Sequence, residues 1–232
     1  MIYGRLKLFI TSFRRGFLSP SKIKRSYSQC AEDLIIEAIF RGRDRIDNGF
    51  YVDVGCHHPR RGSNTFSLYK RGWRGILVDM EKTKVMAARL ARRKDTVVQA
   101  AVSDTVEFAK IYSPNDFSTN ATINLEVAKA DSEYKEVGAV TTTTLTEILN
   151  RYSCPGKFDL LNVDCEGNDL KVLLGLDLVT YSPRVICVEI WEASSGLSGL
   201  LDSAINKHLE KFNYSLRGWS TFSAIYVSKD FG

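Results

Sequence analysis

The stretch Phe50-Tyr51-Val52-Asp53-Val54-Gly55 decides the fold. Aromatic and β-branched residues fill four of its first five positions, a composition typical of a buried strand. Gly55 then lets the chain turn sharply and lets a ligand approach the backbone. The sequence therefore predicts a buried strand over 50–54 that delivers a polar loop, 55–62, to one edge of a sheet.

The rest of the chain alternates short apolar runs with segments of helical period. Strands are predicted over 75–78, 97–102, 158–163 and 184–190, and helices over 63–71, 82–93, 144–152, 169–174 and 199–212. This alternation predicts βαβ crossovers and a parallel sheet in an α/β fold. Residues 214–217 and 222–228 predict an antiparallel hairpin around a Gly218-Trp219-Ser220 turn.

Two further segments complete the predicted domain, which spans 27–232. Ser28 is predicted to cap a helix that runs through Phe40. Residues 105–143 break the alternation and contain the polar run Pro114 to Asn120, which predicts an exposed loop. An insertion of this length is usually functional, so we expect it to shape the substrate site.

Length and composition exclude several classes of protein. The chain has 232 residues, 44% hydrophobic and 25% charged, which is ordinary for one globular domain. No run of about 20 apolar residues predicts a transmembrane helix, and no signal peptide is evident. The five cysteines are widely spaced without a CxxC pair, which argues against a zinc ribbon or disulfide scaffold and favours reduced thiols in a cytoplasmic protein.

The first 26 residues form a basic arm. They contain seven Lys and Arg and no acid, although the whole chain carries a net charge of only +5. Within them, residues 2–17 predict an amphipathic helix, with Ile2, Leu6, Phe9, Phe13 and Phe17 on one face. Two interpretations stay open: residues 1–25 make peripheral contact with a membrane, or they dock on the domain or on a second subunit of an oligomer. The nearly neutral remainder lacks a nucleic-acid footprint, so no nucleic-acid partner is expected.

The carboxyl ends of the predicted parallel strands carry many acids. These ends form the ligand site of an open parallel sheet. Core packing does not explain acids there, because burying an unpaired carboxylate costs several kcal/mol. The residues are Asp53, Asp79, Asp104, Asp164, Glu166 and Glu189, with His57 and His58 beside the first strand.

Two of these acids indicate a particular ligand. Asp53 precedes Gly55, where it would repel a pyrophosphate but suits an ammonium group. Asp79 ends the second strand, where nucleotide-binding α/β folds place the acid that binds ribose hydroxyls. A ligand with an amine at one end and a ribose at the other is S-adenosylmethionine.

Several sequence blocks then carry a resemblance to a known family. They are Tyr27-Ser28-Gln29-Cys30-Ala31-Glu32-Asp33-Leu34, Phe50 to Gly55, Ser63-Asn64-Thr65, Gly72 to Asp79, Asp164-Cys165-Glu166-Gly167 and Pro183 to Glu189. In this order and spacing, from Tyr27 to about Ile190, the sequence resembles the FkbM-type S-adenosylmethionine-dependent methyltransferases, many of which O-methylate sugars or polyketide hydroxyls. His57 stands where methyltransferase loops usually have a second glycine, and Asn162 where a lysine is usual before the DxEG block.

The resemblance implies a fold and a set of cofactor contacts. The fold is a Rossmann-like class I methyltransferase sheet of seven strands, mostly parallel, with a C-terminal antiparallel hairpin. Asp53 and Gly55 would hold the methionine end of S-adenosylmethionine, Asp79 the ribose, and Ser103 and Asp104 would lie near the adenine. Further cofactor contacts are implied at Gln29, Cys56, Asn64, Thr65, Met80 and Asp164.

The catalytic groups are less clearly indicated. Transfer of a methyl group to a hydroxyl benefits from a base, and His57 or His58 could serve as one. Asp164 and Glu166 are further candidates, and Asp164 with Glu189 could bind Mg²⁺. The alternative is that Asp164 contacts the substrate, Glu166 caps a helix and one histidine has a structural role.

Two other functions compete with methyl transfer. An NAD(P)-linked dehydrogenase would need a G-x-G-x-x-G loop after the first strand, and this chain has a single glycine followed by two histidines. A non-catalytic scaffold that binds membrane or RNA through the basic arm would not need the acids. The expected acceptor is a sugar or glycan, because the polar residues of the 105–143 insertion suit a carbohydrate better than a flat apolar substrate. A small molecule, a lipid-linked sugar and a protein glycan all stay open.

Overall fold

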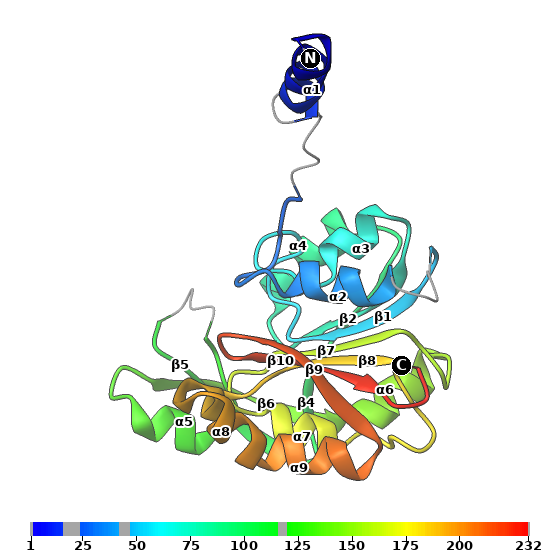
Figure 1. The fold of residues 1–232 in the computed structure, drawn as a ribbon. Helices are drawn as coiled ribbons and strands as arrows, with labels where there is room; N and C mark the ends of the chain where they lie inside the picture. The colour runs from blue at the N-terminus through cyan, green and yellow to red at the C-terminus, as the bar shows by residue number, and fades with distance from the viewer. Residues whose placement is uncertain (1, 16–23, 42–46, 116–119, 232) are drawn as a thin grey trace.

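A computed structural model of the protein describes residues 2–15, 24–41, 47–115 and 120–231. Its central sheet has seven strands in the order β3-β2-β1-β7-β8-β10-β9 (Figure 1). The parallel strands are β1 (Phe50–Val54), β2 (Arg74–Asp79), β3 (Thr96–Gln99), β7 (Leu160–Val163) and β8 (Val185–Glu189). β10 (Ser223–Ser228) is antiparallel to β8 and to β9 (Tyr214–Ser220). The predicted α/β sheet with a C-terminal hairpin is confirmed.

Helices cover both faces of this sheet. Alternate strand residues point to opposite sides, so each face presents side chains on which helices can pack. Helices α2 (Glu32–Phe40), α3 (Phe66–Lys70) and α4 (Lys82–Ala91) lie on one side, and α6 (Leu145–Arg151), α7 (Asp169–Leu174) and α9 (Ala204–Lys211) on the other (Figure 1). Tyr51 packs in one hydrophobic core with Ile36, and its neighbour Val52 packs in the other with Leu145. The two cores fix the sheet and thereby the position of its carboxyl edge.

The 105–143 insertion is more ordered than an exposed loop. β4 (Ala101–Ser103) follows β3 directly but leaves the main sheet and pairs with β6 (Lys135–Thr144), which also pairs with β5 (Phe108–Ser113). Helix α5 (Leu125–Ala130) lies between β5 and β6 in the chain. The predicted loop is therefore wrong in part: the Thr-rich end of β6 has high strand propensity, and it finds partners on both sides.

Two predicted boundaries are also wrong. Ala31, not Ser28, precedes α2, and it adopts a left-handed conformation with φ 69°. The Ser28 hydroxyl accepts the Asp33 N–H of the first helical turn at 3.3 Å and donates to Asp33 Oδ1 at 2.9 Å, as does Ser26 at 2.7 Å, so the chain wraps around the Asp33 carboxylate. The hairpin turn lies at residues 221–222, because 218–220 continue β9 and Ser220 pairs with Ser223.

Two short helices follow β8, and one helix precedes the domain. The two helices after β8 are a 3₁₀ helix at Trp191–Ser195 and α8 (Leu197–Asp202). The helix before the domain is α1 (Ile2–Phe13), which stands apart from the domain (Figure 1). Its predicted extension to Phe17 falls outside the described residues. Within the described ranges, no helix combines the length and the apolar character that crossing a membrane requires.

Candidate active site

A cavity of about 670 Å³ opens at the carboxyl ends of β1, β2 and β7. Most of the residues that the sequence predicted as site residues line it together: Gln29, Asp53, Gly55, Cys56, His57, His58, Asn64, Asp79, Met80, Asp164, Glu166 and Glu189. The predicted Thr65, Ser103 and Asp104 are not in its lining. The cavity falls within the usual size range of small-molecule and cofactor sites.

Asp53 is held rigidly at the floor of the cavity. Its side chain is buried, Oδ2 accepts a hydrogen bond from Thr65 Oγ1 at 2.6 Å, and Oδ1 accepts one from Asn162 Nδ2 at 2.8 Å. Asn64 Nδ2 in turn donates to Asn162 Oδ1 at 2.8 Å. Burial raises the pKa of Asp53, and the two hydrogen bonds and Arg92 oppose that shift. Asn162 therefore supports Asp53, a role that sequence reasoning did not assign to it.

Arg92 lies behind Asp53 as a buried cation. Its side chain is 1% exposed, Nε donates to Asp95 Oδ2 at 2.8 Å, and Nη2 donates to Thr65 Oγ1 at 3.1 Å and to the Tyr51 hydroxyl at 2.7 Å. Through Thr65 the guanidinium is linked to Asp53. Sequence reasoning missed Arg92, because an Arg in a basic helix is indistinguishable by pattern from the exposed Arg89 and Arg93.

Asp79 closes the loop that follows β1. Its Oδ2 accepts from the backbone N–H of His57 at 3.0 Å and its Oδ1 from that of Glu81 at 2.9 Å. Burial raises the pKa of Asp79, and Lys84 and these two bonds lower it. Each carboxylate oxygen has a second lone pair, so both remain able to accept a bond from a ligand.

The two histidines differ in their surroundings. His58 Nδ1 accepts the backbone N–H groups of Arg60 and Arg61 at 3.1 and 2.9 Å, so this ring caps a turn. His57 adopts φ 41°, and its Nδ1 is buried without a hydrogen-bond partner among the described residues. Burial lowers the pKa of both rings, which favours the neutral form. The structural role that the sequence left open for one histidine thus fits His58.

Gly55 is required by the close approach of β1 and β7. Its φ is +78°, and a Cβ at this position would lie 1.7 Å from the carbonyl oxygen of Asp164. Strand pairing in turn fixes Asp164, whose N–H donates to the Val54 carbonyl at 3.0 Å. The absence of a side chain at Gly55 is therefore what brings the first and fourth parallel strands together beneath the cavity.

Asp164 and Glu189 form an acidic pair on neighbouring strand ends. Burial raises the pKa of Asp164 well above its usual range, and the nearby Glu189 raises it further. Burial also raises the pKa of Glu189 to about 7, and Glu189 Oε2 is buried without a partner among the described residues. Burial and the repulsion from Glu189 therefore both favour the protonated form of Asp164.

The predicted metal site is not supported. Among the residues that the structure describes, no group of three or more His, Cys, Asp or Glu side chains is arranged to hold a metal ion. Asp164, Glu166 and Glu189 influence each other electrostatically but do not converge on one point. We therefore assign no metal to Asp164 and Glu189.

Asp169 shapes the loop that carries Asp164. Its Oδ1 accepts from the N–H of Cys165 at 2.9 Å and its Oδ2 from that of Gly167 at 3.1 Å. Burial raises its pKa to about 7 from 3.8 in an unfolded chain. The folded protein therefore binds a proton at Asp169 that the unfolded chain has already lost between these two values.

This shift predicts a pH-dependent stability difference between the native protein and Asp169→Asn. Because the folded pKa is raised, the stability that native Asp169 contributes is greatest below about pH 4 and declines as pH rises to about 7. Urea unfolding at pH 5 and pH 7.5 should show the advantage of the native protein over the Asn variant shrinking by more than about 1 kcal/mol. Other titrating groups largely cancel in the difference. A constant or growing advantage would contradict the raised pKa.

Part of the insertion forms one wall of the cavity. Thr122 Oγ1 donates to the Glu166 carbonyl at 3.0 Å, and Asn124 Nδ2 donates to the Gly167 carbonyl at 2.6 Å. Residues 120–123 consequently line the cavity beside Asp164 and Glu166. The structure thus places residues 120–123 of the insertion at the cavity, and a substrate site shaped by the insertion stays a prediction.

Ser103 and Asp104 lie at the opposite end of β4 from the cavity. A Cβ added at Gly175, which follows α7, would lie 2.3 Å from the Ser103 carbonyl. Ala100, Ala101 and Val102 line the cavity instead. The sequence predicted that Ser103 and Asp104 flank a ligand. It did not show that β3 ends before Ala100, because residues 97–102 fit one continuous strand.

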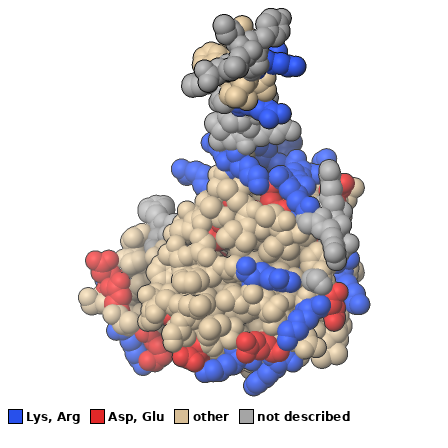
Figure 2. All heavy atoms as spheres, in the orientation of Figure 1, with Lys and Arg blue, Asp and Glu red and all other residues tan. Residues whose placement is uncertain are grey.

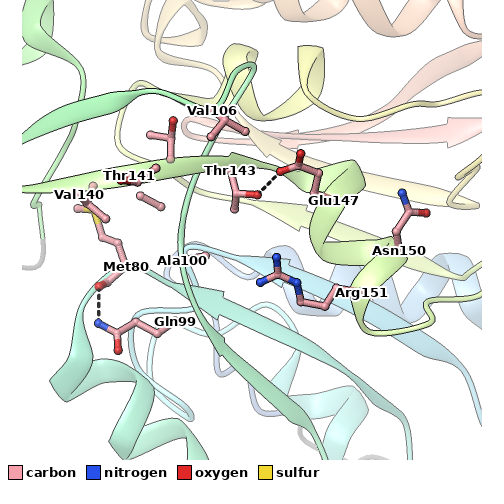
Figure 3. Close-up of a pocket in the computed structure, with 12 residues that line it drawn as sticks. Met80, Gln99, Ala100, Val106, Val140, Thr141, Thr143, Glu147, Asn150 and Arg151 are labelled. Atoms are coloured by element: carbon pink, nitrogen blue, oxygen red, sulfur yellow. Dashed lines mark hydrogen bonds between the residues drawn. The ribbon is translucent and has the colours of Figure 1, made fainter.

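A second, more open cavity of about 930 Å³ adjoins the first at Met80, Ala100 and Ala101 (Figure 3). Thr143, Glu147, Asn150 and Arg151 of β6 and α6 form one side of it. On the other side Gln99 Nε2 donates to the Met80 carbonyl at 3.3 Å. The end of the first cavity near Met80 is therefore open to a larger groove.

The sheet order, the antiparallel hairpin and the acids at the ends of β1 and β2 define a Rossmann-like domain of the methyltransferase class. The sequence match is more specific. The methyltransferase FkbM domain matches residues 53–216, and the chain belongs to that family. The resemblance stated from the sequence blocks is thus confirmed.

Solved structures of methyltransferases are similar to this chain at low identity. A TehB-like S-adenosylmethionine-dependent methyltransferase from Corynebacterium glutamicum is 12% identical, with coverage of 97% of this chain and 99% of the other and a TM-score of 0.45. The precorrin-6y C5,15-methyltransferase from Geobacter metallireducens is 13% identical, with coverage of 91% and 92% and a TM-score of 0.47. An O-methyltransferase from Bacillus cereus, in complex with S-adenosylhomocysteine, is 10% identical, with coverage of 96% and 90% and a TM-score of 0.44. A comparison with curated protein sequences finds no match.

Proposed function

We propose that this protein transfers the methyl group of S-adenosylmethionine to a hydroxyl group of a sugar or glycan. The observation that carries the proposal is the pair of buried acids, Asp53 and Asp79, which line one cavity at the ends of neighbouring strands. The cofactor has an ammonium group at one end and ribose hydroxyls beyond the sulfonium. Asp53 could bind the ammonium group and Asp79 the ribose hydroxyls, in both cases through charge-assisted hydrogen bonds.

The lining of the cavity fits the rest of the cofactor. Asp53, supported by Asn64 and Asn162, would hold the ammonium, and Asp79 would accept bonds from the ribose hydroxyls. Met80, Ala100 and Ala101 offer an apolar surface next to Asp79, which suits the flat adenine ring. The groove of Figure 3 would leave the outer edge of that ring accessible.

We assign two tasks to the protein: it positions the acceptor hydroxyl, and it removes the proton of that hydroxyl. When bound, the cofactor supplies an electrophilic methyl group on a sulfonium. The protein would hold the acceptor hydroxyl in line with that methyl group, which alone can lower a barrier by roughly 7–11 kcal/mol. Asp164 would take the hydroxyl proton as the new O–CH₃ bond forms and the C–S bond breaks. Its raised pKa makes the carboxylate a strong base, and a neighbouring sulfonium charge would favour its ionised form.

Polar side chains of the cavity favour a hydroxyl-rich acceptor. Gln29, Arg61, Asn120 and Thr122 line the same cavity as Asp164 and Glu166. Sugars are recognised through many hydrogen bonds from side chains of this kind, whereas a flat apolar acceptor would need more aromatic surface than this cavity has.

A dinucleotide-binding function fits the loop after β1 less well. The N–H groups of Gly55 and Cys56 donate to the Val78 carbonyl at 2.9 and 3.1 Å, and that of His57 donates to Asp79. A pyrophosphate would need these N–H groups. Occupied donors and two nearby carboxylates therefore disfavour an NAD(P)-linked dehydrogenase.

Cofactor binding should depend on Asp79. We expect Asp79→Ala to weaken S-adenosylhomocysteine binding by about 1.5–3 kcal/mol, because the ribose would lose charge-assisted hydrogen bonds. Isothermal titration calorimetry measures the change. The matched control is Asp104→Ala, an acid that follows β4, lies outside the cavity lining and should leave the affinity within about 0.5 kcal/mol of native.

Three results would contradict this assignment. Unchanged affinity in folded Asp79→Ala would remove Asp79 from the cofactor site. Binding of NAD(P) with no binding of S-adenosylhomocysteine would replace the proposed function by the dehydrogenase alternative, and binding of neither would favour the non-catalytic scaffold.

The acceptor class has a test of its own. The protein would be incubated with S-adenosylmethionine labelled in the methyl group and with free and lipid-linked glycan fractions. A methyl ether formed on a sugar hydroxyl resists mild alkali, whereas a methyl ester does not. Alkali-stable label on a glycan supports the proposal, and alkali-labile label, or label on peptide or nucleic acid only, contradicts it.

A further inference from the structure

Helix α1 has two chemically distinct faces. With 100° between successive residues, Leu6, Phe9, Ile10 and Phe13 fall on one arc of α1, and Lys7 and Thr11 fall on the opposite side together with Leu8; Arg14 and Arg15 directly follow the helix. The Phe9 and Phe13 rings stack with centroids 6.4 Å apart. A helix with an aromatic apolar face and a basic polar face has the composition of helices that lie in a lipid interface.

The apolar face of α1 is directed to solvent. Leu6 is 55% exposed, Phe9 68% and Ile10 49%, values far above those of the domain cores. Every described side chain from Leu6 to Arg15 is exposed. The domain itself therefore does not bury this face.

Basic residues gather where the arm meets the domain (Figure 2). We call this group the basic collar: Lys24, Arg25, Arg60, Arg61 and Lys70, all exposed. Several of its members surround one aromatic cluster. Lys70 Nζ donates to the Tyr27 hydroxyl at 2.7 Å, Arg25 stacks over the same ring at 5.7 Å, and Arg60 stacks over Phe66, which packs edge-on against Tyr27.

The collar lies at the rim of the cofactor cavity. The Ser63 N–H donates to the Tyr27 carbonyl at 3.1 Å, and Ser220 Oγ donates to the Cys30 carbonyl at 2.5 Å. These two bonds fasten residues 27–30 between the 58–63 loop and the β9–β10 hairpin, and Gln29 and Arg61 line the cavity itself. The hairpin adds Phe222, which lines the cavity, and Trp219, both 41% exposed.

We propose that α1 and the basic collar bind an anionic lipid surface and hold the mouth of the cavity against it. Phe9 and its neighbours would insert among the lipid chains, while Lys and Arg of the arm and collar would pair with anionic headgroups. Trp219 and Phe222 at the rim have the amphipathic or apolar character that suits the interfacial zone.

Charge favours a lipid surface over a second copy of the chain. Two α1 helices packed through their apolar faces would bring two basic arms together, and their positive charges would repel. An anionic surface removes that repulsion and covers the apolar face at once. RNA would satisfy the positive charges but would leave the aliphatic side chains Leu6 and Ile10 in water.

Attachment to a lipid surface would restrict the class of methyl acceptor, and this step rests on the proposed function. A cavity mouth held at a lipid surface would receive an acceptor whose sugar projects from the membrane, so the lipid-linked glycan is the favoured form. A soluble sugar would gain nothing from the attachment.

The test compares two full-length variants that change the charge equally. Phe9→Glu places the new carboxylate on the apolar face, and Thr11→Glu places it on the basic face two residues away. Co-sedimentation would use vesicles of phosphatidylcholine with and without phosphatidylglycerol, at low and high salt. We expect native protein to bind the anionic vesicles in a salt-sensitive manner, Phe9→Glu to bind them at least about tenfold more weakly, and Thr11→Glu to retain most of the affinity.

Three results would overturn the proposal. They are native protein that ignores anionic vesicles at low salt, equal losses in the two variants, and an oligomer in gel filtration that Phe9→Glu dissociates without any vesicle binding. An RNA oligonucleotide that binds native protein and Phe9→Glu equally, in the absence of vesicle binding, would favour nucleic acid instead. S-adenosylhomocysteine titration of the same proteins keeps the two proposals apart: vesicle binding without cofactor binding removes the proposed function, and the reverse removes only the lipid surface.

Discussion

Asp164→Asn should lose methyl transfer by about 10²–10⁴-fold while it binds S-adenosylhomocysteine with near-native affinity. The substitution keeps the shape of the side chain and removes its capacity to take a proton. Asp164 follows β7 at the centre of the cavity, next to Glu166 and the insertion wall, whereas Asp53 and Asp79 provide the proposed cofactor contacts on the neighbouring strands. Turnover with a labelled glycan fraction and calorimetry with S-adenosylhomocysteine measure the two effects separately.

The matched control for this prediction is Glu192→Gln. Glu192 follows β8 by three residues, is exposed and does not line the cavity, so its change should leave turnover within about twofold of native. Full activity of Asp164→Asn would show that another group takes the proton, and Glu189→Gln would then be the next variant to assay. A parallel loss of cofactor affinity and turnover would place Asp164 among the cofactor contacts instead.

Much of this site could be predicted because a parallel sheet presents its strand ends at one edge. Asp53, Asp79, Asp164 and Glu189 each lie at the end of a strand of strong β propensity or directly beside it, and the topology alone brings them together. No tertiary detail was needed beyond strand identity and order. The fold could be predicted by the same reasoning, because the apolar runs that form strands alternate regularly with the helices between them.

The parts that could not be predicted depend on single side chains and on chain breaks. β3 ends at Gln99 and a separate strand, β4, begins at Ala101, so Ser103 and Asp104 lie outside the cavity lining that the sequence predicted for them. Ser28 accepts an N–H of the first helical turn, but its hydroxyl also donates to the buried Asp33 carboxylate, and the helix begins only after Ala31. Local patterns do not encode such competition, because the winning partner is chosen by packing elsewhere in the fold.

Arg92 is the strongest example, and its removal should have the largest effect on stability. We expect Arg92→Met to lower the free energy of unfolding by about 3–5 kcal/mol, because it leaves the buried Asp95 carboxylate without its cation. Asp95 would keep only the hydrogen bonds from the Tyr51 hydroxyl and the Gly75 N–H, at 2.7 and 3.1 Å. Burial already raises the pKa of Asp95, and Arg92 is the first of the groups that oppose the shift. Urea unfolding measures the loss.

Two companion variants separate charge from packing. Arg89→Met changes an exposed arginine near the end of α4, the helix that Arg92 follows, and should cost no more than about 0.5 kcal/mol. Adding Asp95→Asn to Arg92→Met removes the unpaired charge and should recover part of the loss, which a double-mutant cycle reports as coupling. Equal costs for Arg92→Met and Arg89→Met would refute the buried network. Because Arg92 also donates to Thr65, which donates to Asp53, the folded fraction of Arg92→Met should bind S-adenosylhomocysteine more weakly, so one buried cation would link the stability of the sheet to the cofactor site.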